Sequence, residues 1–331
     1  MDSIEQTTDV LVIGAGMAGL IAAAELQRAG RSVRVLDKGR GVGGRLASRR
    51  IEGTTFDHGA PGFTASHPWF TTEVVQARLN GAVANWTPSS AAVHPDSRSW
   101  RGTPSMSAVP KQLARSLDLQ LETTVTDLRH QADRWVATTA SGQTFASRAV
   151  VLTAPVPQAL VLLKAGGLEL APALRSRLDA LEYERCLTVM AVLDGPSRIP
   201  SPGGVILSGG PIASITDNAA KGISAEPAVT LHATSAFSLA HWDNDRLESG
   251  RILLSAAADW LGAGVRTFQV HGWRYSQPTI RDTEPCLLVS HAPPLALAGD
   301  AFGGGGVEGA ALSGRAAAQT LLAHGAVSSG S

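Results

Sequence analysis

A short glycine-rich turn near the N-terminus constrains the fold of this chain more than any other feature. The apolar run "DVLVI" (9–13) has the length of a buried strand, "GAGMAG" (14–19) follows it, and residues 20–29 have the pattern of a helix. "SVRVLD" (32–37) then predicts a second strand. Strand, turn, helix and strand in this order predict a βαβ unit, and with it an α/β fold.

The turn itself has the spacing G-x-G-x-x-G at Gly14, Gly16 and Gly19. In this setting the first glycine makes the tight turn and the second lets the backbone approach a pyrophosphate. The third lets the helix lie close to the strand. Asp37 ends the next strand, where a carboxylate can accept hydrogen bonds from ribose hydroxyls. We therefore predict a dinucleotide site, and the acidic side chain argues against a 2′-phosphate there.

A second glycine-rich loop, "GRGVGGR" (39–45), continues directly from the strand that ends at Asp37. Its Arg45 is placed to give the pyrophosphate a charge-assisted hydrogen bond. NAD dehydrogenases do not usually carry such a loop here, so it favours FAD over NAD. The alternative is that the loop is a solvated basic turn.

A third glycine-rich segment, "ALAGDAFGGGGVEGAALSG" (296–314), lies close to the C-terminus. An apolar strand stops before Asp300, four glycines follow, and small residues at spacings of three and four predict a helix from Val307. We expect Asp300 to bind ribityl hydroxyls and the helix to direct its positive end at the flavin N1–C2=O edge. By itself the segment could be an ordinary loop, but with the N-terminal motif it predicts FAD.

Composition excludes several classes of partner. Lys and Arg together number 28 and so do Asp and Glu, which leaves no electrostatic footprint for nucleic acid or an anionic membrane surface. The two cysteines, Cys186 and Cys286, have neither CxxC nor metal spacing and fit a reducing compartment. The longest apolar stretch, 10–24, is broken by glycines and predicts neither a signal peptide nor a membrane span. We expect a cytoplasmic protein with no metal and no protein partner.

The order of the expected elements predicts two domains. The expected helices cover 66–81, with Ser66 as N-cap, 102–117, 157–164, 172–182 and about 238–261. Short strands over 119–151 predict an antiparallel meander with a hairpin turn at Ser141-Gly142, and others are expected at 187–193, 204–208, 212–216, 228–234 and 267–275. The predicted architecture is a Rossmann-type FAD domain, a mixed-sheet substrate domain and a short tail. Their expected bounds are 1–65, 101–156 and 279–326 for the FAD-binding domain, 66–100 and 157–278 for the substrate domain, and 327–331 for the tail.

Motifs along nearly the whole chain resemble those of the renalase family, and of its bacterial members in particular. These are flavoproteins in the amine-oxidase-like branch of the FAD-dependent oxidoreductases. "VIGAGMAGL", "DKGRGVGGR" and the C-terminal glycine segment occur in many FAD enzymes, whereas "LHATS" and "WRYSQ" are more specific. The other motifs that carry the resemblance are "FDHGAPGFTA", "GTPSMSAV" and "VVLTAPVPQA".

The resemblance implies an FAD oxidase that acts on dihydronicotinamide isomers of NAD(P)H, those reduced at ring position 2 or 6. The products would be NAD(P)+ and, after reoxidation of the flavin by O2, H2O2. Non-covalent FAD is expected, because the C-terminal flavin motif has no cysteine or histidine. Carried over by motif, the cofactor contacts fall on Gly14, Gly16, Ala18, Gly19, Asp37, Lys38, Gly44, Arg45, Ala60, Pro61, Val125, Asp300, Val307, Glu308, Gly309 and Ala310.

The same resemblance places the substrate contacts on Asn218, His232 and Trp273. A dihydropyridine is already a hydride donor, so positioning rather than a strong base is required, and His232 and Asn218 could hold its carboxamide. Core packing is the alternative for His232 and Trp273. After "DHGA" bacterial members generally carry Gln-Tyr, where this chain has Pro61-Gly62, which removes an amide and a phenol from beside the flavin.

Three other functions stay open on the sequence. An amine oxidase would hold its substrate between paired aromatic side chains, but the chain has only two tyrosines, Tyr183 and Tyr275, and Gly306 stands where an aromatic residue could precede the last helix. A carotenoid- or porphyrinogen-type desaturase would need a long apolar tunnel, for which no pattern is present. A flavin-bearing protein without turnover is the third alternative.

Overall fold

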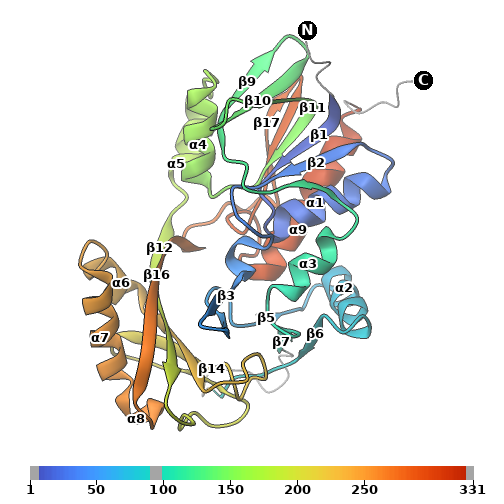
Figure 1. Cartoon of the computed structure of the whole chain (residues 1–331). Helices are drawn as coiled ribbons and strands as arrows, with labels where there is room; N and C mark the ends of the chain where they lie inside the picture. Colours follow the sequence, from blue (N-terminus) through green and yellow to red (C-terminus); the bar gives the residue numbers. More distant parts are fainter. Residues whose placement is uncertain (1–6, 90–98, 326–331) are drawn as a thin grey trace. The chain divides into compact units, whose positions relative to one another are not determined.

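A computed structural model describes residues 7–89 and 99–325 of the chain (Figure 1). The chain divides into two compact units, each built from separated segments. Unit 1 comprises Met1–Gly44, Pro110–Glu182 and Gln277–Ser331, and unit 2 comprises Arg45–Val109 and Tyr183–Ser276. The predicted α/β class with a Rossmann-like part is confirmed.

Unit 1 is organised around an eight-stranded mixed sheet. Its centre is parallel: β1 pairs with β2 on one side and with β11 on the other, with Val12 opposite Val35 and Val151. The long β11 also pairs antiparallel with β10, which pairs with β9, so the expected meander is present. The strands are β1 Thr8–Ile13, β2 Val33–Leu36, β8 Asp118–Gln120, β9 Val125–Gln131, β10 Arg134–Thr139, β11 Thr144–Leu152, β17 Leu287–His291 and β18 Pro294–Leu297.

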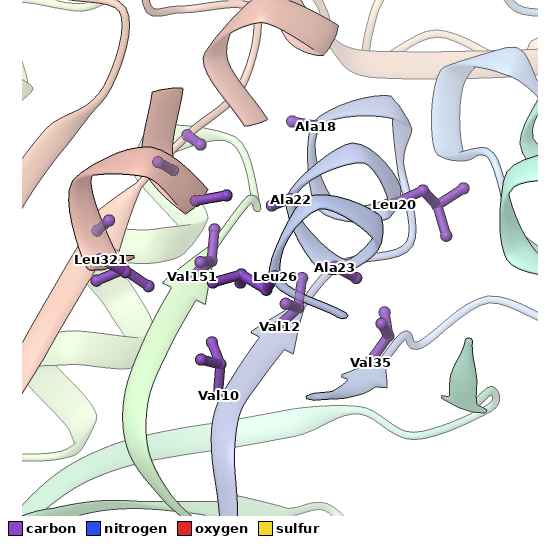
Figure 2. Close-up of a cluster of buried hydrophobic side chains, with 14 of the residues drawn as sticks. Val10, Val12, Ala18, Leu20, Ala22, Ala23, Leu26, Val35, Val151 and Leu321 are labelled. Carbon is purple, nitrogen blue, oxygen red and sulfur yellow. The ribbon is translucent and has the colours of Figure 1, made fainter. Parts of the chain in front are cut away.

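Helices from the two ends of the chain pack together in unit 1. These are α1, Met17–Arg28, and α9, Gly306–Ala323, which lie side by side (Figure 1). A Cβ atom added at Gly314 would lie 2.1 Å from the backbone oxygen of Ala18, so glycine permits the close approach. Figure 2 shows Leu321 of α9 beside Leu26 of α1 and Val151 of β11, within the buried apolar cluster of this unit.

Unit 1 also contains a segment that the sequence places in the other domain. Helices α4, Val156–Ala165, and α5, Pro172–Asp179, belong to it because α4 packs against β9. Conversely, residues 45–65, expected in the FAD domain, fall in unit 2, where the hairpin of β3, Ser48–Ile51, and β4, Thr54–Asp57, packs against β15. The expected tail, 327–331, lies outside the described residues.

Unit 2 is built on a second, five-stranded sheet in the order β13-β14-β15-β12-β16. The pairs β13/β14, β14/β15 and β15/β12 are antiparallel. Its strands are β12 Tyr183–Leu193, β13 Gly204–Ile206, β14 Ile212–Asp217, β15 Ala228–Ala233 and β16 Val265–Pro278. A small sheet joins β5 Phe63–Thr64, β7 Ser99–Gly102 and β6 Val83–Asn85, and the helices of the chain not yet named are α2 Pro68–Leu79, α3 Ala108–Ala114, α6 Ser235–Ala240, α7 Arg246–Ala256 and α8 Ala258–Leu261.

Three expected helices differ from the structure. The helix expected over 102–117 is only α3, Ala108–Ala114, and Gly102 is the last residue of β7. The N-cap of α2 is His67 rather than Ser66, because the His67 side chain accepts the hydrogen bond from Trp69 N. The single helix expected over 238–261 is three helices, since Asp245 caps a new start by accepting from Glu248 N. None of the helices within 7–89 and 99–325 is long and apolar enough to cross a membrane.

Candidate functional site

The glycines of the first turn in unit 1 have the local roles that their spacing predicts. Gly14 adopts φ +111°, a left-handed conformation that favours glycine, and its N–H donates to Leu36 O at 2.8 Å. A Cβ atom at Gly19 would lie 1.9 Å from Gly14 O, so α1 can begin against the strand only because Gly19 has no side chain. These two glycines therefore set the path of the turn.

Gly16 differs from its neighbours because the space above it is open. It is the N-cap of α1, no side chain caps the helix there, and a Cβ atom at this position would meet nothing within 4 Å. An uncapped helix start whose positive end faces open space suits an anion. The turn thus has room for the pyrophosphate of a dinucleotide, and the residues fit the predicted cofactor.

Asp37 holds the two glycine-rich loops of unit 1 in place. Its carboxylate accepts hydrogen bonds from Ala15 N and from Gly39 N, each at 2.6 Å. Gly43 N donates to Ala15 O at 2.7 Å, which ties the second loop to the first. Each carboxylate oxygen keeps a further lone pair, so Asp37 retains the capacity to accept from a ribose hydroxyl.

The C-terminal corner of unit 1 is similarly built around glycine. Asp300 is 5% exposed and follows β18, while Gly299 N donates to Ser313 Oγ of α9 at 2.9 Å. Helix α9 begins at Gly306, one residue before the expected Val307, and its N-cap Gly305 has φ +75°. No side chain caps this helix start either, so α9 offers the uncapped positive end that the flavin prediction requires.

The other expected cofactor residues are divided between the units. Arg45 donates from Nη1 to Ser276 O at 3.0 Å within unit 2. Contacts of all these residues with FAD stay predictions. Ala18, Lys38, Gly44, Val125, Glu308, Gly309 and Ala310 lie in unit 1, and Arg45, Ala60 and Pro61 lie in unit 2.

In unit 2 the expected substrate residues His232 and Trp273 belong to a cluster of rings that also contains His58 and His271. The indole Nε1 of Trp273 donates to His58 O at 2.9 Å, and His232 Nε2 lies 3.3 Å from the same oxygen. The ring centroids of His271 and Trp273 are 4.3 Å apart, and that of His58 lies 5.1 Å from each of them. We call these four residues the imidazole–indole cluster.

The sequence analysis missed His58 and His271. His58 stands in the "FDHGAPGFTA" motif, and His271 lies two residues before "WRYSQ". Alternation along a strand gives His271 the same face as Trp273 and could have identified it. Nothing local identifies His58, because its ring partners lie more than 200 residues later in the chain.

Burial lowers the pKa of every histidine in the cluster. For His58, which is 6% exposed, the pKa falls from 6.5 to about 3, with His271 and Arg49 adding to the effect of burial. Burial also lowers the pKa of His232 and of His271, aided by Lys221 in the first case and by Arg49 and Arg246 in the second. The rings are therefore neutral at pH 7, and the charges that act on them are cationic.

The depressed pKa of His58 predicts a stability that depends on pH. Between pH 6.5 and about 3 the unfolded chain binds a proton that the folded chain does not, so the free energy of unfolding decreases as pH falls through this window. At 1.36 kcal/mol per pKa unit, His58 alone should lower the free energy of unfolding by about 2 kcal/mol between pH 7.5 and pH 5. Urea unfolding at the two pH values measures this difference.

His58→Gln should make that pH difference smaller by about the same 2 kcal/mol. His130→Gln is the matched control, because His130 is an exposed histidine of unit 1. An unchanged pH difference in His58→Gln would show that His58 titrates normally in the folded protein.

A buried ion pair adjoins the cluster. Lys221 Nζ lies 2.8 Å from Asp57 Oδ2, and both side chains are 0% exposed. The same ammonium group donates to Pro61 O and stands 4.7 Å above the Trp86 ring. Asp57 Oδ1 accepts from Ser48 Oγ at 2.7 Å and from Met106 N at 2.9 Å. Lys221 therefore anchors the chain on both sides of His58, at Asp57 and at Pro61. The carbonyl oxygen of His58 is the one that accepts from Trp273 Nε1.

Asn218 lies in the same buried region and forms its hydrogen bonds there. It is 0% exposed, its Nδ2 donates to Thr230 Oγ1 at 3.0 Å, and its Oδ1 accepts from Asp57 N at 3.4 Å. Both ends of the amide are therefore bonded within the protein. The expected contact of Asn218 with a substrate stays a prediction, and the geometry shows a role in anchoring β4.

Two family models match the chain. A model described as an NAD(P)-binding Rossmann-like domain matches residues 12–76, and one described as flavin containing amine oxidoreductase matches residues 94–322. Among curated proteins, 4,4'-diapolycopene oxygenase of Methylomonas sp. is 41% identical over 76 residues. That match spans 23% of this chain and only 14% of the relative.

Solved structures match almost the whole chain at low identity. A CLA-producing fatty acid isomerase from P. acnes is 12% identical with a TM-score of 0.70, and putrescine oxidase with bound putrescine is 14% identical with a TM-score of 0.70. Each match covers 96% of this chain and 99% of the other. At these identities the similarity establishes the fold alone.

Proposed function

Because this chain belongs to the flavin containing amine oxidoreductase family, a class of flavin-dependent oxidoreductases, we propose that it oxidises dihydronicotinamide isomers of NAD(P)H. The substrates are the forms reduced at ring position 2 or 6, and the product is NAD(P)+. Bound FAD would supply the acceptor for the hydride of the substrate, and its two electrons with two protons would convert O2 to H2O2. We propose a renalase-like enzyme that holds FAD without a covalent bond, so that denaturation releases all the flavin.

The chain's own residues have binding and positioning roles in this proposal. Gly16 and the start of α1 hold the pyrophosphate of FAD, and Asp37 accepts from a ribose hydroxyl. Trp273 and His232 would contact the nicotinamide ring, and the His58 carbonyl oxygen, which lies within hydrogen-bond distance of both side chains, holds their orientation. Fixed orientation is what a substrate that is already a hydride donor requires.

One observation supports a dihydronicotinamide over an amine. Outside the Lys221–Asp57 ion pair, the charged groups that shift the pKa values of the cluster histidines are the cations Arg49 and Arg246. The adjoining carboxylate, Asp57, is already paired with Lys221. A protonated amine would be repelled in this field, whereas a neutral ring attached to anionic phosphates would be attracted.

The test is anaerobic mixing of the purified protein with each substrate class, with the bleaching of the flavin followed by stopped-flow absorbance. We expect the 2- and 6-dihydro isomers of NADH to reduce the flavin at least 100-fold faster than ordinary NADH or putrescine. The reason is geometric, because effective molarity falls steeply when the donor carbon is displaced by about an ångström. Faster bleaching by putrescine than by either isomer would contradict the proposal and favour an amine oxidase.

A matched pair of variants tests the role of the cluster. His232→Ala should slow flavin reduction by the isomers by about 10- to 100-fold while the FAD content and reoxidation by O2 stay unchanged. His130→Ala, at an exposed histidine of unit 1, should leave all three measurements unchanged. If no substrate class bleaches the flavin of the wild-type protein, a flavoprotein without turnover becomes the better description.

A further inference from the structure

Three arginines from three different elements of unit 2 surround one tryptophan. Trp242, between α6 and α7, is buried. The Cζ atoms of Arg246, Arg185 and Arg274 lie over its ring at 4.7, 5.0 and 6.0 Å from the centroid. Arg185 belongs to β12, Arg246 begins α7, and Arg274 belongs to β16. We call these three residues the arginine triad.

The triad has no anionic partner within the described part of the chain. None of the three guanidinium groups makes a hydrogen bond or an ion pair with another described residue, and Arg246 Nη1 is buried without a partner. The carboxylate of Asp245, the N-cap of α7, accepts a hydrogen bond from Glu248 N. Stacking on the indole stabilises each cation, but the like charges still repel one another.

A glycine in β16, Gly272, leaves the space in which Trp242 and Arg246 pack. A Cβ atom at Gly272 would lie 3.1 Å from the Trp242 ring and 3.2 Å from Arg246 Nη2, so the absent side chain gives both groups their place against β16. A planar ring has two faces, and at least two of the three guanidinium groups must therefore share one. Two guanidinium forks close together can bind the oxygens of one tetrahedral anion, each fork through two parallel hydrogen bonds.

We propose that the arginine triad is a binding site for a phosphate group. Arg274 is exposed, and Arg185 and Arg246 are half-buried, so solvent can reach the arginine triad. The Trp242 ring beneath the three guanidinium groups is buried. Arg274 and Trp273 are successive residues of β16 and point to opposite faces of the sheet. Arg274 therefore points away from the face that carries Trp273, although Arg246 of the triad also acts on His271 of the imidazole–indole cluster. The phosphate site does not rest on the proposed activity.

The test is calorimetric titration of the holoprotein with inorganic phosphate and, in a second arm, with AMP, each at constant ionic strength set by NaCl. We expect saturable binding of phosphate, weakened at least tenfold in Arg274→Gln and in Arg185→Gln. Arg274→Lys should bind with intermediate affinity, because it keeps the charge and loses the fork. Tighter binding of AMP than of phosphate would identify a nucleotide as the source of the phosphate group.

The matched control is Arg251→Gln, which removes an exposed arginine of the same helix that takes no part in the triad. Its phosphate affinity should equal that of the wild-type protein. Circular dichroism melting of all variants checks that they fold alike. The proposal is overturned if folded wild-type protein shows no saturable binding above that of chloride, or if Arg251→Gln loses as much affinity as Arg274→Gln.

Discussion

Lys221→Met should destabilise the holoprotein by about 3–5 kcal/mol, one of the two largest effects that the structure predicts. The substitution keeps the length of the side chain but leaves the fully buried Asp57 carboxylate without its cation. It also leaves Pro61 O without its donor and Trp86 without the charge above its ring. Urea unfolding in the presence of excess FAD measures the loss.

The double variant Asp57→Asn, Lys221→Met separates charge from packing. With both charges removed, the cost of an unpaired buried carboxylate disappears, and we expect at least half of the lost stability to return. The amide introduced by Asp57→Asn keeps an oxygen for Ser48 and Met106, the two other donors to this side chain. Lys111→Met, at an exposed lysine, is the control and should change stability by no more than about 0.5 kcal/mol. A double variant no more stable than Lys221→Met would contradict this account of the pair.

Gly16→Ala and Gly19→Ala should both yield protein that lacks FAD, but for different physical reasons. At Gly16 an added methyl group meets no protein atom within 4 Å and projects into the space that we assign to the pyrophosphate. The variant should therefore fold as the wild-type apoprotein does and bind FAD at least 100-fold more weakly. At Gly19 the same methyl group would lie 1.9 Å from Gly14 O, which belongs to the backbone and cannot rotate away.

Gly19→Ala should accordingly lower the stability of the apoprotein by about 3 kcal/mol, whereas Gly16→Ala should leave it within about 0.5 kcal/mol. The measurements are the flavin absorbance per chain after purification and the urea midpoint of each apoprotein. Gly30→Ala is a useful third variant, since its φ of +80° strains an alanine although no atom lies within 4 Å; it should lose stability and keep FAD. A fully flavinated Gly16→Ala protein would place the dinucleotide site elsewhere.

The sequence predicts those parts of the molecule whose signals are local. The βαβ unit from Thr8 to Leu36, the meander and the helix after the four glycines each have their pattern within about 30 residues, and all three are present. The hairpin of β3 and β4 is not predicted, because "SRRIEGTTFD" (48–57) has no clear alternation of apolar and polar residues. The helix expected over 238–261 is interrupted by a cap at Asp245 that periodicity does not detect.

The parts of the site that sequence reasoning missed depend on contacts between distant residues. Asp57 and Lys221 are 164 residues apart, and neither stands out alone, since a single aspartate or lysine is usually solvated. Only the fold shows that each neutralises the other in a buried place. The contacts of Asn218 likewise depend on distant residues. The family motif suggested a ligand contact for it, but its amide is hydrogen-bonded to β4 and β15.

The return of the C-terminus to unit 1 has a consequence for synthesis on the ribosome. The parallel partner of β11 is β18, with Val150 opposite Leu295, 145 positions further along the chain. At about 5–20 residues per second, that strand emerges roughly 7 to 30 s after β11. During this interval the nascent chain carries a β11 edge without its final neighbour and an α1 face without α9. An unpaired apolar edge is open to association with other chains, so the translation rate over residues 150–295 sets how long this protein is exposed to misassembly.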